Sequence, residues 1–144
     1  MSNLWGNVMN VFLKVMKALS DPNRVKILKM LQYRNLCVCE MRAALEVAQP
    51  TVSKHLKILE TAGLVKSYKD GLWVNYHLAD GASSPFAATM LGNLRHWLET
   101  DPDMLRIKEV LPCLCREQLC GKVPAPPHAE SLRACQNPPK HIQV

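Results

Sequence analysis

The order of elements between residues 38 and 78 constrains the fold more than any other feature of this sequence. Two short stretches with helical spacing, residues 38–45 and 49–62, follow each other closely. Two β-prone runs, residues 65–69 and 72–78, come next and are joined by the dipeptide of Asp70 and Gly71, a strong hairpin signal. Two helices followed at once by a hairpin are typical of winged helix-turn-helix domains. The sequence therefore predicts a mainly α-helical winged helix-turn-helix fold with a small β-hairpin.

The second of these helices has two different faces. Val52, Leu56 and Leu59 form one apolar stripe, and Gly63 is a plausible stop. The opposite face carries Pro50, Lys54, Lys57 and Thr61, with Thr51 and Ser53 on its flanks. Lysines and hydroxyl groups suit contacts with phosphates and base edges. An ordinary solvated helix face is the alternative interpretation.

The flanking segments predict further helices and a dimer. Residues 4–19 form an amphipathic helix, and Ser20 caps a second one that ends near Arg34. Residues 85–99 form a last long helix, and residues 104–111 add a further turn or two. The first and last long helices carry more apolar surface than a small core can cover, so we expect a homodimer that pairs through them. Closure of the monomer core by these helices is the alternative.

Charge and motifs narrow the class of protein. Residues 1–80 hold eleven Lys and Arg against six Asp and Glu, which suits a polyanionic partner. We find no leader peptide and no uncharged apolar run of about 18 residues, so we expect a cytoplasmic protein with no membrane partner. No phosphate-binding loop or nucleophile motif is present, so we expect neither an enzyme nor an organic cofactor.

Six cysteines, at positions 37, 39, 113, 115, 120 and 135, indicate metal or redox chemistry in a reducing compartment. We expect a DNA-binding and dimerisation domain over residues 1–111 and a cysteine cluster over residues 112–120. The remaining residues, 121–144, hold five of the ten prolines and are predicted to be a disordered tail. Cys135, in that tail, is predicted to be a bystander.

Three sequence runs resemble the ArsR/SmtB family of metal-sensing repressors: LCVCE at 36–40, AQPTVSKHLKILETAGLV at 48–65 and KDGLWVNYHL at 69–78. The resemblance covers residues 10–100. It implies a homodimeric repressor that binds double-stranded operator DNA and releases it when a thiophilic ion binds Cys37 and Cys39. The DNA contacts that it implies are Gln49, Thr51, Ser53, Lys54, His55 and Lys57 in the reading helix, with Lys66 and Lys69 in the wing.

The sequence departs from the family pattern at the sensor. The arsenite-sensing subgroup has a third cysteine where this chain has Arg42, and the zinc and nickel sensors have paired ligands where this chain has a lone His96. Cys113, Cys115 and Cys120 form a C-x-C-x4-C cluster of soft ligands that could complete the site. We favour one ion per subunit, shared between the two regions, with the third thiolate from the same or the partner subunit. An ion bound by the downstream cluster alone is the alternative.

The leading hypothesis is a repressor that responds to As(III) or Sb(III). A Cd(II) or Pb(II) sensor with four thiolates is one alternative, and a thiol-redox or persulfide sensor is another. Residues i and i+2 of a helix lie about 200° apart. We therefore expect an ion held by Cys37 and Cys39 to unwind or re-aim the start of the helix at residues 38–45.

Overall fold

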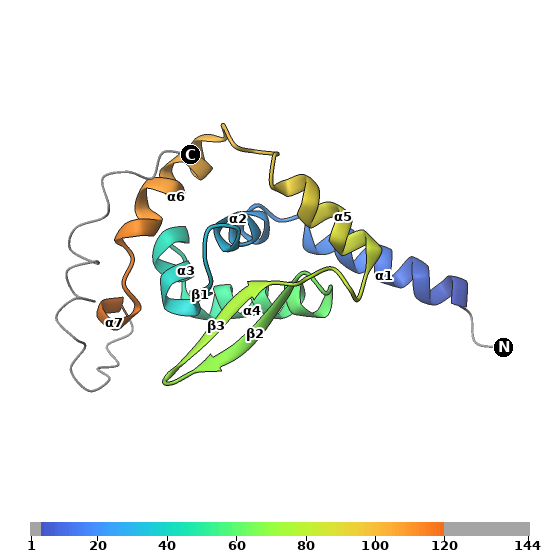
Figure 1. The fold of residues 1–144 in the computed structure, drawn as a ribbon, viewed down its shortest axis with the longest axis horizontal. Coiled ribbons are helices and arrows are strands. Elements are labelled where there is room, and N and C mark those ends of the chain that lie inside the picture. The colour runs from blue at the N-terminus through green and yellow to red at the C-terminus, as the bar shows by residue number, and fades with distance from the viewer. Residues whose placement is uncertain (1–3, 120–144) are drawn as a thin grey trace.

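The computed structural model of the chain describes residues 4–119 (Figure 1). Its elements are α1 (Leu4–Ala18), α2 (Pro22–Leu31), β1 (Leu36–Cys37), α3 (Val38–Leu45), α4 (Gln49–Thr61), β2 (Val65–Asp70), β3 (Trp73–Leu78), α5 (Pro85–Leu94), α6 (Pro102–Val110), the 3-10 turn η1 (Leu111–Cys113) and α7 (Arg116–Leu119). Helices α2, α3 and α4 form the centre, with the hairpin against them. The predicted fold class, a mainly helical winged helix-turn-helix, is confirmed.

The core is one apolar cluster fed by every helix from α1 to α6. Helix α4 contributes Val52, Leu56 and Leu59, each no more than 1% exposed, which is the apolar stripe that the sequence predicts. Its N-terminus places Pro50 in the first turn, where a missing N–H costs little. Gly63 follows the helix with a φ of 77°, a left-handed conformation that glycine adopts without strain. One face of α4 is thus anchored in the core, and the helix ends at a defined position before Gly63.

The sheet has three strands, in the order β1-β3-β2. The hairpin register pairs Asp70 with Trp73, so the two-residue loop is Gly71 and Leu72 rather than the Asp70 and Gly71 that the sequence indicates. Gly71 takes a φ of 59°, as a tight hairpin loop requires. Strand β1 pairs Cys37 with Asn75 of β3 and was not predicted, because a two-residue strand is too short to show a periodic pattern.

Helix α2 begins one residue later than the sequence predicts. Asp21 is the cap, since its Oδ1 accepts from the backbone N–H groups of Asn23 at 2.8 Å and Arg24 at 3.1 Å. Ser20, the predicted cap, donates its hydroxyl to the Lys17 carbonyl instead. The helix also ends at Leu31, before the predicted end near Arg34. That leaves Arg34 in a connecting segment, where its side chain can reach another part of the chain.

Helix α5 ends at Leu94, not near residue 99 as predicted. The fully buried Lys29 explains the early end, because its Nζ donates to the Leu94 carbonyl at 2.7 Å and pairs with the Glu99 carboxylate. Glu99 also pairs with Lys108 at 2.5 Å. Leu98, between Leu94 and Glu99 in the sequence, takes a φ of 63°, which a right-handed α-helix cannot contain. The chain therefore turns back over α2 before Asp101 caps α6.

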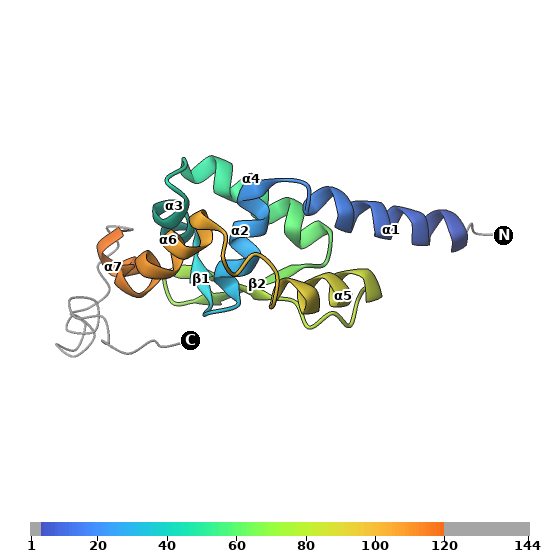
Figure 2. The same cartoon turned by 90° about the horizontal axis from the view of Figure 1, so that it is seen from above.

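Residues 111–119 continue past α6 and fold back on the domain, with α7 packed against α3. Figure 2 shows α6 and α7 at the end of the molecule opposite to the free end of α1. We call residues 111–119 the strap. The strap includes most of the predicted cysteine cluster at residues 112–120, with Cys113 and Cys115. Cys120 and the predicted tail at 121–144, including Cys135, lie outside the described residues.

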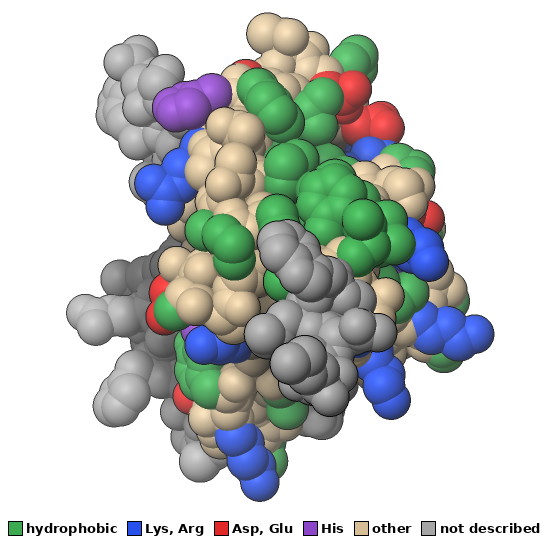
Figure 3. Space-filling view, turned by 90° about the vertical axis from the view of Figure 1, so that its right-hand side faces the viewer, with side chains coloured by type: hydrophobic (Ala, Val, Ile, Leu, Met, Phe, Trp, Pro, Cys, Tyr) green, Lys and Arg blue, Asp and Glu red, His purple; other side chains and the backbone are tan. Residues whose placement is uncertain are grey.

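Helix α1 carries an apolar face that the described chain leaves uncovered. Its side chains are 37–57% exposed at five successive apolar positions, namely Val8, Met9, Val11, Phe12 and Leu13. Phe12 also contacts Phe86 of α5 edge to face, with ring centroids 5.3 Å apart. Figure 3, which views the end of the molecule that carries α1 and α5, shows hydrophobic side chains gathered there. These are the two helices that the sequence assigns to dimerisation.

Candidate functional site

The outer face of α4 presents the polar residues that the sequence predicts. Gln49, Thr51, Ser53, Lys54 and Lys57 are all exposed on it. Thr61 is exposed too, but its hydroxyl donates to the Lys57 carbonyl at 2.8 Å. Because the opposite face is locked into the core, these side chains are held on a rigid element. The arrangement can offer a duplex two ammonium groups together with amide and hydroxyl groups.

His55 differs from the other residues predicted to contact DNA. Its side chain is only 12% exposed, and its Nε2 lies 4.0 Å from the Asp21 carboxylate. Its Nδ1 lies 3.2 Å from the Arg24 guanidinium. Both neighbours belong to the start of α2, so His55 joins the two helices rather than lying on the exposed face. The structure therefore does not bring His55 together with Lys54 and Lys57.

The two lysines predicted in the wing, Lys66 and Lys69, lie on opposite faces of the hairpin, since side chains alternate along a strand and two residues stand between them. Both are exposed. Lys66 pairs across the hairpin with His77 and lies near Asp80. The Ala82 N–H, and then Lys66, hold the pKa of Asp80 below its usual value. Lys69 shares its face with Val74 and has no such acidic neighbour directly across the strand pair.

Cys37, the first cysteine of the predicted sensor, is buried at the start of α3. It is 2% exposed and precedes the helix in an extended conformation, with a φ of −90° and a ψ of 169°. Its backbone N–H donates to Glu40 Oε1 at 3.0 Å. Burial, and to a lesser degree the Glu40 carboxylate, raise the pKa of the Cys37 thiol to about 11. At neutral pH this group is a protonated thiol, which an incoming ion must deprotonate.

The remaining cysteines of the described chain have different surroundings. Cys39 lies within the first turn of α3 and is disulfide-bonded. Cys113 is exposed, with its Sγ 3.9 Å from the Glu109 carbonyl. Cys115 is 6% exposed, and its Sγ donates to Glu117 Oε2 at 3.0 Å. Within residues 4–119 no three potential ligands are grouped as a preformed metal site.

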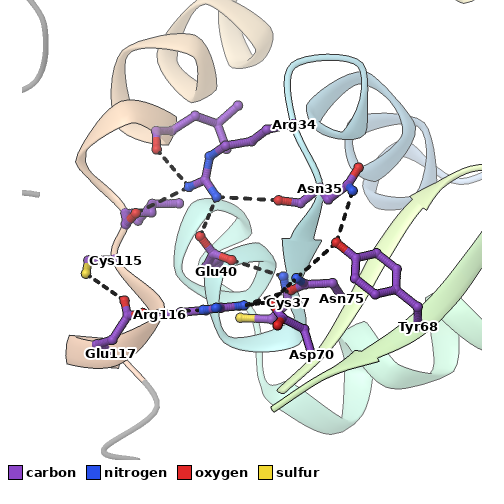
Figure 4. Close-up of polar contacts among 12 residues, drawn as sticks. Arg34, Asn35, Cys37, Glu40, Tyr68, Asp70, Asn75, Cys115, Arg116 and Glu117 are labelled. Atoms are coloured by element: carbon purple, nitrogen blue, oxygen red, sulfur yellow. Dashed lines mark hydrogen bonds and ion pairs between the residues drawn. The ribbon is translucent and has the colours of Figure 1, made fainter. Parts of the chain in front are cut away.

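Arg34 ties the strap to the start of α3, as Figure 4 shows. Its guanidinium bonds the buried Glu40 at 2.6 Å, and it also donates to the carbonyls of Leu111 at 3.3 Å and Leu114 at 3.2 Å. Glu40 in turn bonds the backbone of Cys37. A single arginine thus links the first cysteine segment to the residues on either side of Cys113 and next to Cys115.

A small pocket of about 190 Å³ lies where these two segments meet. Residues of the first cysteine segment, of strand β3 and of the strap line it, namely Arg34, Asn35, Glu40, Asn75, Leu114, Cys115, Arg116 and Glu117. The lining is largely charged or polar, which favours a small polar guest over an apolar one. Cys115 is the thiol that lines this pocket, whereas the sequence alone did not distinguish it from its neighbours.

Sequence reasoning missed the residues that connect these parts. In the sequence, Glu40 appears only as the acidic end of the LCVCE run, and Arg34 appears only as the predicted end of a helix. Arg116 bonds Asp70 at 2.8 Å across 46 residues of sequence, and no local pattern could have predicted this pairing. His96 is exposed and lies in the turn that follows α5.

Comparison with known proteins adds a family to this geometry. Residues 21–67 match the family described as bacterial regulatory protein, arsR family. The arsenic resistance transcriptional regulator of Pseudomonas putida is 36% identical over 100 residues, which cover 67% of this chain and 77% of that protein. A homologue of the cadmium resistance transcriptional regulatory protein in Staphylococcus aureus is 44% identical over 68 residues, covering 46% of this chain and 56% of that protein.

Among solved structures, a homodimeric winged helix-turn-helix DNA-binding domain from Mycobacterium bovis has a similar fold. The TM-score is 0.56 at 22% identity, over 66% of this chain and 84% of that one. Over the part of the chain that the structure describes, no helix combines the length and apolarity needed to cross a membrane. The matched family and this similar fold both agree with the winged helix-turn-helix arrangement of α4 and the hairpin.

Proposed function

We propose that this chain, which belongs to the ArsR/SmtB family of winged helix-turn-helix transcriptional repressors, releases its operator when trivalent arsenic or antimony binds its cysteine thiolates. Its relatives are DNA-binding transcriptional regulators, and the chain is not an enzyme. The ligands that we propose are Cys37 and Cys39, completed by a thiolate of the downstream cluster: Cys113, Cys115 or Cys120. The identity of the ion and of its ligands is the proposal, and the family is its premise.

The observation that carries the proposal is the attachment of the strap to the first cysteine segment. Arg34 bonds both Glu40 at the start of α3 and two carbonyls of the strap. Cysteines some 75 residues apart in sequence therefore belong to neighbouring segments of the fold. Three soft thiolates suit a trivalent metalloid, and the relative from Pseudomonas putida is named for arsenic resistance.

The protonation state of Cys37 is compatible with arsenite as the incoming species. Arsenous acid carries three hydroxyl groups, and each As–S bond forms as a thiol gives its proton to one hydroxyl, which leaves as water. The exchange is therefore neutral in protons, so a thiol whose pKa is raised to about 11 can still react. A divalent cation such as Cd(II) would have to expel the proton into solvent, at a cost that falls as the pH rises.

The position of Cys37 revises the expected conformational change. Cys37 precedes α3 in an extended conformation, and only Cys39 lies within the helix. The angle of about 200° between positions i and i+2 of a regular helix therefore does not apply to this pair. Burial replaces it as the obstacle: an ion reaches Cys37 only if the strap or the first turn of α3 moves.

We propose that the operator is read by α4, through Gln49, Thr51, Ser53, Lys54 and Lys57, with the wing lysines Lys66 and Lys69 on the DNA backbone. Their exposure on a rigid helix and on the hairpin supports this assignment. His55 acts indirectly, because its contacts with Arg24 and Asp21 fix α4 against α2. A homodimer through α1 and α5 would place two reading helices on successive major grooves.

A thiol-redox sensor is the second candidate, and the disulfide of Cys39 is the observation that favours it. In that mechanism two thiols lose two electrons and two protons to an oxidant such as peroxide, which is reduced to water. The disulfide would then hold the first cysteine segment in one position and set the affinity for DNA. The reduced protein is therefore the starting point of any test that separates the two candidates.

A titration of the operator complex separates the candidates. The fully reduced protein is bound to a fluorescent operator duplex, and As(III), Sb(III), Cd(II) and peroxide are added in parallel, with anisotropy as the measurement. We expect As(III) and Sb(III) to release the DNA, with a rise in its dissociation constant of about 5- to 150-fold. Release by peroxide alone would sink the metalloid proposal, and release by Cd(II) alone would replace it with the divalent sensor.

The matched variants are Cys37→Ser and Cys135→Ser in the same assay. Cys37→Ser should still bind the operator and should lose its response to As(III), because one ligand is gone. Cys135→Ser should respond as the wild type does. A Cys37→Ser protein that keeps the full response would mean that the downstream cluster acts by itself.

A further inference from the structure

The strap is fixed to the hairpin as well as to the first cysteine segment. Arg116, the residue after Cys115, donates from Nη1 to Asp70 Oδ2 at 2.8 Å, and the same nitrogen lies 3.4 Å from Asn75 Oδ1. Asp70 ends strand β2 beside the hairpin loop, and Asn75 lies on β3. Figure 4 shows the guanidinium reaching from the strap to these two side chains. The strap is thereby connected to the wing by a side chain that neighbours a candidate ligand.

The Arg116 guanidinium has more partners than a surface ion pair usually has. Its Cζ lies 4.3 Å from the ring centroid of Trp73, which is 7% exposed, and its Nε lies 3.4 Å from Glu117 Oε1. A lone ion pair between Arg116 and Asp70 would contribute little stability, since the Asp70 side chain is 46% exposed. A planar guanidinium that stacks on an indole and bonds two carboxylates is held in one orientation. Arg116 therefore forms a fixed connection between the strap and the hairpin rather than a transient surface contact. We call this connection, made by Arg116 with Asp70 and Trp73, the joint.

Asn75 is the point at which the two cysteine segments converge on the wing. It pairs with Cys37 across strands β1 and β3, and its amide donates to Asp70 Oδ2 at 3.1 Å and to the Tyr68 hydroxyl at 3.3 Å. Asp70 is the carboxylate that Arg116 binds. Cys37 is thus connected to the wing through the sheet. Cys115 is connected to the side chains of Asp70 and Asn75 through its neighbour Arg116.

From this geometry we propose that Arg116 is the positioning residue through which ion binding at the cysteine site changes the position of the DNA-binding wing. The inference rests on the proposed function, because it assigns a route for the response of the same site. In the structure the Cys115 thiol donates a hydrogen bond to Glu117 Oε2, and Glu117 Oε1 accepts a hydrogen bond from Arg116. When Cys115 binds As(III), its proton leaves with an arsenite hydroxyl as water, so Sγ can no longer donate a hydrogen bond to Glu117 and presents only lone pairs to the carboxylate. Glu117 and Arg116 then shift together, and the wing loses the guanidinium that fixes Asp70 and Trp73.

The test compares Arg116→Gln with a matched control, Arg106→Gln, by operator anisotropy in the presence and absence of As(III) and Cd(II). Arg106 lies on α6, loses the same charge and pairs only loosely with Glu46 at 3.8 Å, away from the wing. Binding of each ion to the DNA-free protein is measured separately by calorimetry. Asp70→Asn, on the hairpin side of the same joint, serves as a second variant whose substitution leaves the strap intact.

We expect the wild type and Arg106→Gln to lose operator affinity by about 5- to 150-fold when the ion binds. Arg116→Gln and Asp70→Asn should bind the ion within about threefold of the wild type yet lose most of that change, retaining less than about fivefold. A Trp5→Phe, Trp97→Phe background supplies a second readout. In it, the ion should shift the emission of Trp73, and Arg116→Gln should abolish the shift.

Two results would overturn the inference while leaving the proposed function standing. One is full release of the operator by Arg116→Gln and Asp70→Asn, since the joint would then carry no signal. The other is loss of ion binding itself in both variants, which would make Arg116 part of the binding site rather than a link from it. A wild-type protein that neither ion releases from DNA contradicts the proposed function, and the inference with it.

Discussion

At the scale of single residues, the structure sorts the predicted DNA contacts by what else each side chain does. Lys54 and Lys57 are exposed and free of acidic partners among the described ion pairs, whereas His55 is engaged by Arg24 and Asp21. The helical period of α4 was enough to predict which side chains face outward. The same period places His55 beside the apolar stripe, and its DNA contact was implied only by the family resemblance; its pairing with Arg24 of another helix could not be predicted from local sequence.

Lys57 provides the cleanest residue-scale test of DNA contact. Lys57→Ala should weaken operator binding and reduce the slope of log affinity against log salt by about one, because one phosphate contact and its released counterion are lost. Anisotropy titrations at several salt concentrations measure both quantities. Arg95→Ala, which removes one exposed positive charge from the turn after α5, is the control and should leave the slope unchanged. An unaltered slope in Lys57→Ala would remove Lys57 from the DNA interface.

Cys37 shows how a residue can be placed by sequence and yet be misjudged chemically. The LCVCE run located it at the start of a helix, and the structure agrees. Its burial, and the pKa of about 11 that follows from it, come from packing in the folded chain, where Cys37 pairs with Asn75 of β3, and the local sequence pattern does not encode this packing. Because burial raises the pKa of this thiol from its usual value of 9.0, the protonated thiol favours the folded state below about pH 9. That contribution is lost as the pH rises towards 11.

At the scale of elements, the sequence predicted those with a long apolar period and missed those set by distant contacts. Helices α1, α3 and α4 match the predicted ranges to within a residue. The early end of α5 depends on Lys29, a buried lysine 65 residues away in sequence that takes the Leu94 carbonyl. Strand β1 exists only because β3 lies beside it. Local periodicity cannot report either interaction.

Helix α1 supplies the element-scale prediction, which concerns the dimer. Val8 is 50% exposed on its apolar face, and Val8→Glu would place a carboxylate where the proposed interface must exclude water. We expect the dimer dissociation constant to rise by at least about tenfold, equivalent to about 1.4 kcal/mol. Sedimentation velocity over a range of protein concentrations measures it.

Leu105→Glu is the matched control, because Leu105 is 49% exposed but lies on α6. It should sediment as the wild type does. If Val8→Glu also leaves the dimer unchanged, the uncovered face of α1 is not the interface.

At the scale of the whole molecule, the candidate sensor is assembled from parts that the chain order keeps apart. Arg34 and Arg116 each bridge the strap to an earlier element, one to the start of α3 and the other to the hairpin. The sequence predicted that cysteines downstream would complete the pair in LCVCE, on the ground that Arg42 stands where a third ligand is expected. It could not indicate how the strap returns, because both bridging arginines act over long sequence separations.

The proposed sensor requires thiolates from both cysteine segments to bind one ion. X-ray absorption at the arsenic edge counts the sulfur neighbours of As(III) directly in the fully reduced, loaded protein. We expect three sulfur ligands in the wild type, and fewer when Cys113, Cys115 and Cys120 are all replaced by serine. Three sulfurs that persist in that triple variant, or only two in the wild type, would contradict it.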